Sequence, residues 1–151
     1  MDCSHAPRYC FGHGLSYTRF EYSGLCVAPG QSSAEIRLTV RNTGDVSGEE
    51  VVQLYFADEY ASVTRPQREL AGFCRAALQP GEEKQIRFTL PYSQLAFWAG
   101  ARGWKIEKGS YRVLAGASSE DIRLEGAFTV EKDQWIDGKT RALYTLGQVE
   151  K

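Results

Sequence analysis

The chain carries almost no net charge, and this excludes several classes of partner. Its 151 residues include 18 Lys and Arg against 19 Asp and Glu, which gives a net charge of −1 at pH 7. A protein without an overall positive field has no general attraction to phosphate backbones or to anionic lipid surfaces. We therefore expect neither nucleic acid nor a membrane among its partners.

Long apolar runs are also missing. No stretch approaches the ~20 apolar residues that a membrane-spanning helix needs. Residues 1–8 contain no basic segment that leads into an apolar run, which is the pattern of a secretory signal peptide. The sequence therefore predicts a cytoplasmic chain without a membrane anchor.

Cysteine is scarce, and its few positions do not indicate a disulfide framework or a metal site. A chain of this length can bury a core of its own, so reduced thiols are expected. The spacing C-x-H-x4-C-x2-H does supply ligand types that zinc accepts, but it differs from the paired Cys-x2-4-Cys knuckle. We predict no metal and no cofactor. The residues concerned are Cys3, His5, Cys10 and His13, with Cys26 and Cys74 elsewhere in the chain.

Apolar and polar residues alternate with a period of two, and no long helical pattern occurs. Residues 34–41 and 85–90 alternate strictly, as half-buried strands do, and residues 51–56 are apolar on both faces, as in a central strand. The fold class is therefore all-β. We expect an immunoglobulin- or fibronectin type III-like antiparallel β-sandwich of about seven strands, with a barrel as the alternative. Further strands are expected at 69–78, 104–106, 111–116 and 122–130.

Several ordered blocks of sequence carry a resemblance to a known family: residues 11–20, Gly44 and Gly48 with 51–55, Arg65 to Phe73, Pro80–Gly81, Phe97–Trp98 and Gly109 to Ser119. The chain resembles the C-terminal fibronectin type III-like domain of family-3 glycoside hydrolases of the β-glucosidase and β-xylosidase type, over about Phe11 to Val130. It departs from that family at Cys10 and Ala99, where Pro and an acidic residue are usual.

The resemblance implies a domain organisation and a function. Residues 1–14 would be a linker, 15–130 the β-sandwich, and 131–151 a C-terminal tail that packs either on the sandwich or on a catalytic domain. The family's nucleophilic Asp and acid/base Glu lie in other domains, which cannot fit into this chain. We therefore expect a non-catalytic module that stabilises the catalytic domains of an enzyme hydrolysing terminal β-glycosidic bonds, and that lends a loop to the edge of their cleft.

No catalytic residues are assigned to the chain itself. Glycoside hydrolysis needs two carboxylates flanking the bond, about 5–10 Å apart in a cleft. The neighbouring acidic pairs, such as Glu49–Glu50, lie in turns or at strand ends and are interpreted as solvated. A Gly-x-Ser-x-Gly elbow and a phosphate-binding loop are also missing from the sequence.

The recognisable glycines and aromatic residues have structural interpretations. Gly12 and Gly14 are expected to let the backbone turn before the first strand, and Gly44 to serve a turn dihedral angle. Gly72 would mark a bulge before Phe73 packs inward. Tyr111 follows a glycine turn and is expected to cap a backbone group, as in a tyrosine corner.

The polar segment from Asp58 to Arg68, which contains Pro66, is expected to be a loop. Arg65 and Glu69 can pair across it, and an exposed pair contributes only about 0–1 kcal/mol. Arg65 is also a candidate contact with carbohydrate or with a neighbouring domain.

Two other functions remain open on the sequence. Sugars stack on flat aromatic rings, so Trp98, Trp104 and Tyr60 are candidates for an autonomous carbohydrate- or polymer-binding module, with Trp135 and Tyr144 also available. The alternative for Trp98 and Trp104 is that they fasten their own hairpin to the sandwich. Exposed strand edges would instead allow a protein-interaction module.

Overall fold

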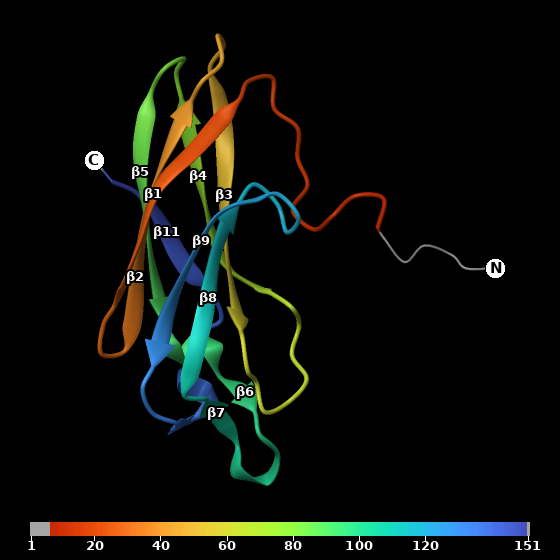
Figure 1. Ribbon diagram of the computed structural model, residues 1–151, viewed down its shortest axis with the longest axis vertical. Coiled ribbons are helices and arrows are strands. Elements are labelled where there is room, and N and C mark those ends of the chain that lie inside the picture. Colours follow the sequence, from red (N-terminus) through yellow and green to blue (C-terminus); the bar gives the residue numbers. More distant parts are fainter. Residues whose placement is uncertain (1–6, 151) are drawn as a thin grey trace, which may run out of the picture.

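A computed structural model describes residues 7–150, and this part of the chain is built almost entirely of strands (Figure 1). None of its helices is long and apolar enough to cross a membrane. The strands are β1 (Phe20–Pro29), β2 (Ser33–Asn42), β3 (Gly48–Asp58), β4 (Glu69–Leu78), β5 (Glu83–Pro91), β6 (Phe97–Trp98), β7 (Trp104–Ile106), β8 (Gly109–Gly116), β9 (Ile122–Val130), β10 (Gln134–Ile136) and β11 (Thr145–Val149). The short 3-10 helices are η1 (Tyr92–Leu95), η2 (Gly100–Arg102) and η3 (Gly138–Thr140).

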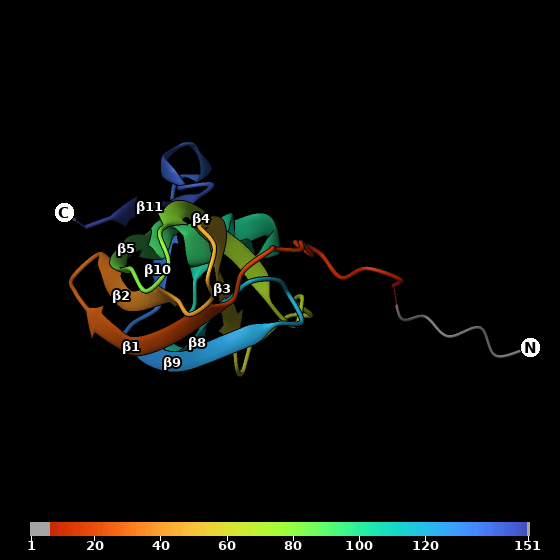
Figure 2. The ribbon, with the colours of Figure 1, turned by 90° about the horizontal axis from the view of Figure 1, so that it is seen from above.

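Eight strands form one sheet in the order β1-β2-β5-β11-β4-β3-β8-β9. Neighbouring strands are antiparallel except for β11 and β4, which are parallel. The sheet curls until its edge strands β1 and β9 contact each other, as the view from above shows (Figure 2). It therefore surrounds its core in a barrel-like way.

The prediction of about seven strands is wrong, because the described part of the chain has eleven. Strands β1, β10 and β11 were not predicted from the sequence. Strand β11 lies between β5 and β4 and joins the two halves of the eight-stranded sheet by hydrogen bonds. The C-terminal tail thus packs on this domain. Packing on the sandwich was the first of the two arrangements that the sequence left open, the other being packing on a catalytic domain.

The core lies inside the curled sheet and follows the alternation in the sequence. Ile36, Leu38 and Val40 of β2 face Ile86 and Phe88 of β5, and all five side chains are buried. Each fully buried side chain of this size stabilises the fold by about 1.5–3 kcal/mol. Strict alternation on both strands therefore fixes their register, since a slip of one residue would turn every apolar side chain outward.

Strand β4 contains a bulge at Ala71, where Gly72 pairs with Leu54 but Leu70 pairs with Tyr55. A bulge is therefore present next to Gly72, but the expectation that Phe73 packs inward is wrong. Phe73 is 61% exposed, because Cys74, Ala76 and every second residue after them face the core. The outer face of β4 therefore carries a large aromatic side chain that no neighbouring strand covers.

Strands β6, β7 and β10 form a small second sheet at one end of the domain, in the order β10-β7-β6 (Figure 1). Trp98 pairs with Trp104, and Trp135 pairs with Lys105. Directly paired residues project from the same face of a sheet. Trp98 and Trp135 therefore belong to opposite faces of this small sheet.

Candidate functional site

The N-terminal segment, residues 7–19, runs along one side of the sheet and is fastened to it by the side chain of Gln53 (Figure 1). The Gln53 Nε2 donates hydrogen bonds to the carbonyl oxygens of Gly12, at 3.0 Å, and of Ala117, at 2.5 Å. The Tyr55 hydroxyl donates to Gln53 Oε1 at 2.6 Å. One buried amide therefore joins the N-terminal segment to β3 and to the loop between β8 and β9.

A second attachment lies at the other end of this segment. The Thr18 hydroxyl donates to Asn42 Oδ1 at 2.7 Å, while Asn42 Nδ2 donates to the carbonyl oxygens of Val46 and Leu78. Asn42 is fully buried, so its amide anchors Thr18 to the interior of the domain. The N-terminal segment is thus a bridge held at both ends, and not a free tether.

The glycines near these attachments have different roles from one another. Gly12 has a φ of +77°, as expected of a turn, but Gly14 and Gly44 do not have positive φ. Gly44 lies in the bend between β2 and β3, and a Cβ there would lie 2.3 Å from Thr18 Oγ1, so close packing excludes a side chain. Gly14 faces open space.

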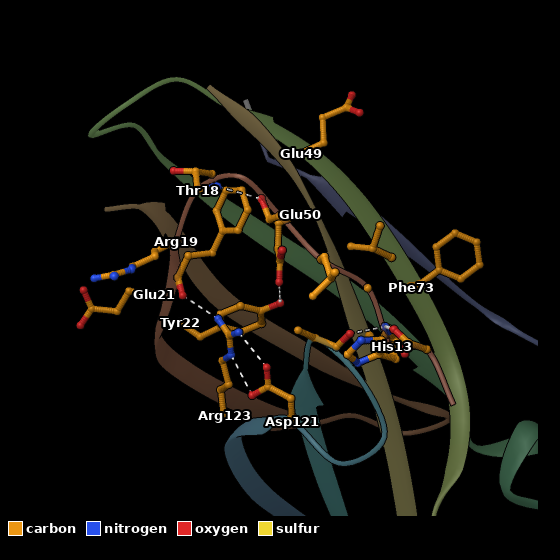
Figure 3. A pocket seen from close by; sticks show the side chains of 18 of the residues that line it. His13, Thr18, Arg19, Glu21, Tyr22, Glu49, Glu50, Phe73, Asp121 and Arg123 are labelled. Carbon is orange, nitrogen blue, oxygen red and sulfur yellow. Dashed lines mark hydrogen bonds and ion pairs between the residues drawn. The ribbon is translucent and has the colours of Figure 1, made fainter. Parts of the chain in front are cut away.

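A groove lies between the N-terminal segment and the outer surface of β1, β3 and β4, with a cavity volume of about 990 Å³ (Figure 3). We call it the N-terminal groove. Its walls combine apolar and charged side chains. Its lining includes Phe11, Leu15, Phe20, Tyr22, Glu50, Val51, Phe73, Asp121 and Arg123.

Glu50 is the buried carboxylate of this groove. It is 7% exposed and accepts a hydrogen bond of 2.6 Å from the hydroxyl of Tyr22, which is buried to the same degree. Burial raises the pKa of Tyr22, and the adjacent Glu50 carboxylate raises it further. The interpretation of the Glu49–Glu50 pair as solvated is therefore wrong for Glu50. Alternation along β3 turns Glu50 inward while Glu49 points outward (Figure 3).

Arg123 lies beside this pair but is already engaged. Its guanidinium donates to both carboxylate oxygens of Asp121, at 3.1 and 2.8 Å, and to the carbonyl oxygen of Phe20 at 2.6 Å. The hydrogen bonds from Arg123 lower the pKa of Asp121. The guanidinium also stacks on the Tyr22 ring, 4.8 Å from its centre.

Arg65 organises a different region, the loop between β3 and β4. Its side chain is only 7% exposed, donates to Glu69 Oε1 at 2.7 Å and to the Leu95 carbonyl oxygen at 3.1 Å, and lies 3.5 Å from an Asp58 carboxylate oxygen. The ring of Phe97 stacks on the guanidinium. The expected pairing with Glu69 is present, but the expectation that the pair is exposed is wrong for Arg65, because its guanidinium packs against the Leu95 carbonyl oxygen and the Phe97 ring. Pro66, next to Arg65, is exposed.

The predicted aromatic candidates do not converge. Trp98 is 60% exposed and Tyr60 lies exposed in the loop after β3, whereas Trp104 is partly buried, with its ring 4.7 Å from the Arg141 guanidinium and in edge contact with Trp98. A shallow hollow of about 470 Å³ beside β6 and β7 is lined in part by Trp98, Lys105 and Trp135. Trp98 and Trp135 project from opposite faces of the small sheet, and both border this hollow, which is open to solvent.

Tyr111 is fully buried, and its hydroxyl donates to the Glu107 carbonyl oxygen at 2.9 Å. Its ring stacks on Phe128 at 5.7 Å. Half of the Cys/His array, Cys3 and His5, lies outside the described residues. Within residues 7–150, no group of three or more His, Cys, Asp and Glu side chains is placed to hold a metal ion.

Sequence reasoning missed the two polar residues on which this site depends, Gln53 and Glu50. A signal for Gln53 was present, since it is a polar residue within the apolar run 51–56 of a central strand. A buried polar side chain needs hydrogen-bond partners, so such a residue marks a connection to another segment. Glu50 gave no comparable signal, because it follows another glutamate at the start of the strand.

Comparison with known proteins agrees with this architecture. Residues 50–119 match the family model of the fibronectin type III-like domain. Thermostable β-glucosidase B of Acetivibrio thermocellus is 42% identical over 129 residues, which are 82% of this chain and 17% of that protein. Among solved structures, β-glucosidase 3B from Thermotoga neapolitana superimposes with a TM-score of 0.83 at 38% identity, over 85% of this chain and 18% of that one.

A GH3 β-glucosidase from Bifidobacterium adolescentis gives a similar result, with a TM-score of 0.80 at 38% identity, over 88% of this chain and 20% of that one. The fold and the family model thus define a fibronectin type III-like domain. The chain belongs with the fibronectin type III-like domains of family-3 glycoside hydrolases and spans a fifth or less of the relatives named here.

Proposed function

We propose that the chain is a non-catalytic accessory domain of a family-3 glycoside hydrolase that cleaves terminal β-glycosidic bonds, and that it packs against the catalytic domains and stabilises them. One observation carries the proposal: the N-terminal segment is fastened at Gly12 by Gln53 and at Thr18 by Asn42. A linker held in this way fixes the orientation of this domain relative to the domain that precedes it. A free tether would not.

The exposed apolar surface around this segment supports the same function. Tyr9, Phe11, Leu15 and Tyr17 are all well exposed on it, and Phe73 is exposed on the neighbouring sheet. A large cluster of exposed apolar side chains on a soluble domain generally marks an interaction site. In the longer enzyme this surface would be covered by the catalytic part of the chain.

The proposal includes the finer description of the fold. Strands β1, β2 and β5 form one layer and β4, β3, β8 and β9 the other, which is the division expected of a fibronectin type III-like sandwich. In this description β11 is an added strand that closes one side. It comes from the part of the chain that lies beyond the sequence resemblance.

A second candidate function is contact with carbohydrate at the small sheet. The observation that favours it is the exposure of Trp98 (60%) and Trp135 (47%) beside the hollow that Lys105 also lines. This would allow the loops there to form part of the edge of a catalytic cleft. Isothermal titration of the chain with β-linked gluco-oligosaccharides, compared with Trp98→Ala and Trp135→Ala, tests it. No heat of binding would contradict an autonomous sugar site.

The accessory function is tested in a chimera. In thermostable β-glucosidase B of Acetivibrio thermocellus, this chain replaces the segment to which it is similar, and a second protein has that segment deleted. The chimera should keep β-glucosidase activity and inactivate on heating more slowly than the deleted enzyme. A deleted enzyme that is as active and as heat-resistant as the chimera would contradict the function.

A further inference from the structure

We propose that the N-terminal groove receives an apolar segment bearing one positively charged side chain, Lys or Arg, from the catalytic part of the same glycoside hydrolase chain, and that this charge pairs with Glu50. The inference rests on the proposed function. It identifies the surface of this domain that docks and the chemical character of the segment that docks there.

The charge of Glu50 is the first reason. The carboxylate is 7% exposed, yet no ion pair among residues 7–150 includes it, and the hydroxyl of Tyr22 is its hydrogen-bond donor. Arg123 is nearby but donates to Asp121 and to the Phe20 carbonyl oxygen. The charge of Glu50 also acts on Arg123, but Arg123 is hydrogen-bonded to another acid, so the buried carboxylate is only partly compensated. A cation brought by a partner would compensate it.

The apolar lining is the second reason. Phe73 is 61% exposed, and Phe11, Leu15 and Val51 are exposed around the same groove. In Figure 3, Phe73 projects from β4 and Glu50 lies between it and Tyr22, within the same groove. Glu50 lies on the opposite face of β3 from Val51, so the segment would contact Phe73 and Val51 with its apolar side chains and would reach Glu50 with its charged side chain beside Tyr22, where the groove is lined by both residues.

The geometry of the N-terminal segment is the third reason. It forms one wall of the groove and is held at Gly12 and Thr18, so the groove exists before a partner arrives. The matched segment is only 17% of β-glucosidase B, so most residues of such an enzyme lie outside it. The resemblance to C-terminal domains means that those residues would join this domain through the N-terminal segment, beside the groove.

Glu50→Gln tests the charge pair, because the substitution should have different effects on stability in the isolated chain and in the chimera. Gln can still accept the Tyr22 hydrogen bond, so the substitution removes the charge alone. In the isolated chain, urea unfolding should show that the substitution leaves the midpoint unchanged or raises it. In the chimera, the partner's cation would be left unpaired, and the half-life at the inactivation temperature should fall roughly threefold to tenfold. Glu131→Gln, at an exposed position, is the matched control and should change neither.

Val51→Asp tests the apolar contact in the same chimera. The side chain is exposed in this domain, so the isolated chain should fold normally, whereas a charge buried in the docked interface should shorten the half-life about tenfold or more. Leu143→Asp places the same charge on an exposed apolar position outside the groove and should change the half-life less than twofold or so. Equal half-lives for all four variants and the parent chimera would overturn the proposal.

A photo-crosslinking side chain at position 73 identifies the occupant directly. Crosslinked peptides should join this domain to residues of the catalytic part within one polypeptide. Crosslinks that join two copies of the enzyme, or that stay within the 151 residues, would overturn the groove proposal. The accessory function would still be judged separately, by the comparison of the chimera with the deleted enzyme, so the two failures can be told apart.

Discussion

The side-chain amide of Gln53 donates a hydrogen bond of 3.0 Å to the carbonyl oxygen of Gly12, 41 residues earlier in the chain. The same nitrogen reaches the Ala117 carbonyl oxygen, and the Tyr55 hydroxyl satisfies the amide oxygen. Three segments far apart in the sequence therefore meet at one buried side chain. This contact fixes the direction in which the chain enters the domain.

Gln53→Leu should lower the free energy of unfolding by about 1–3 kcal/mol, because it leaves two carbonyl oxygens and one hydroxyl without their partner. Urea denaturation of the chain measures the change. Hydrogen exchange should also show loss of protection at the Ser119 amide, which donates to the Phe11 carbonyl oxygen. Gln148→Leu, at an exposed position, is the control. Equal stabilities for the two variants would contradict the anchoring role.

Gly72→Ala should destabilise the domain while Gly14→Ala should not. A Cβ at Gly72 would lie 2.1 Å from the carbonyl oxygen of Thr145, so β11 would have to move away from β4. Such overpacking costs about 1–3 kcal/mol. A Cβ at Gly14 meets nothing within 4 Å. Thermal unfolding of both variants measures the difference, and a Gly72→Ala protein as stable as the parent would show that β11 is not held against β4 as described.

The alternation of apolar and polar residues was sufficient to predict most of the large sheet. Strands β2, β4, β5 and β9 lie where the sequence places them, because each has one face on the core and therefore a period of two. Strand β1 was missed, since Phe20–Pro29 has only one fully buried residue, Tyr22. A strand that leaves most of its side chains exposed has no strong periodicity to detect.

The tail and the groove could not be predicted for a different reason. Strand β11 has five residues, of which Thr145 alone is buried, and it exists because β4 and β5 leave room between them. The burial of Glu50 depends on the N-terminal segment and on Tyr22 of β1, both distant in the sequence. Local patterns do not carry such long-range information. The outward direction of Phe73 similarly became clear only with the bulge at Ala71, two residues away.

Arg65→Met should be far more destabilising than the loss of a surface ion pair. The guanidinium bridges Asp58, whose side chain is 4% exposed, and Glu69, so its removal leaves buried carboxylate charge uncompensated. Breaking a buried pair from one side costs about 3–5 kcal/mol. Arg112→Met removes an exposed partner of Glu125 and should cost about 0–1 kcal/mol. Urea denaturation compares them, and similar values would mean that the Arg65 network contributes no more than a surface pair.

The stability of the domain should fall in acid, in part through Asp121. The hydrogen bonds from Arg123 hold the pKa of Asp121 below its usual value, which is about 3.9 in an unfolded chain. The stability that this contributes is therefore present above about pH 4 and is lost as the pH falls through the lower, folded pKa. Urea denaturation at pH 7 and at pH 3 should show a smaller loss for Asp121→Asn than for the parent chain. Asp45→Asn, at an exposed position, should behave like the parent, and an identical loss in all three would contradict the assignment.

The size of the native polypeptide tests the central claim most directly. An antibody raised against this domain is used to probe a lysate of the source cells after denaturing electrophoresis. We predict a band several times larger than 16.9 kDa, since the matched segment makes up 17% of β-glucosidase B. A band near 16.9 kDa alone would mean that the domain acts without a catalytic part, and this would contradict the account.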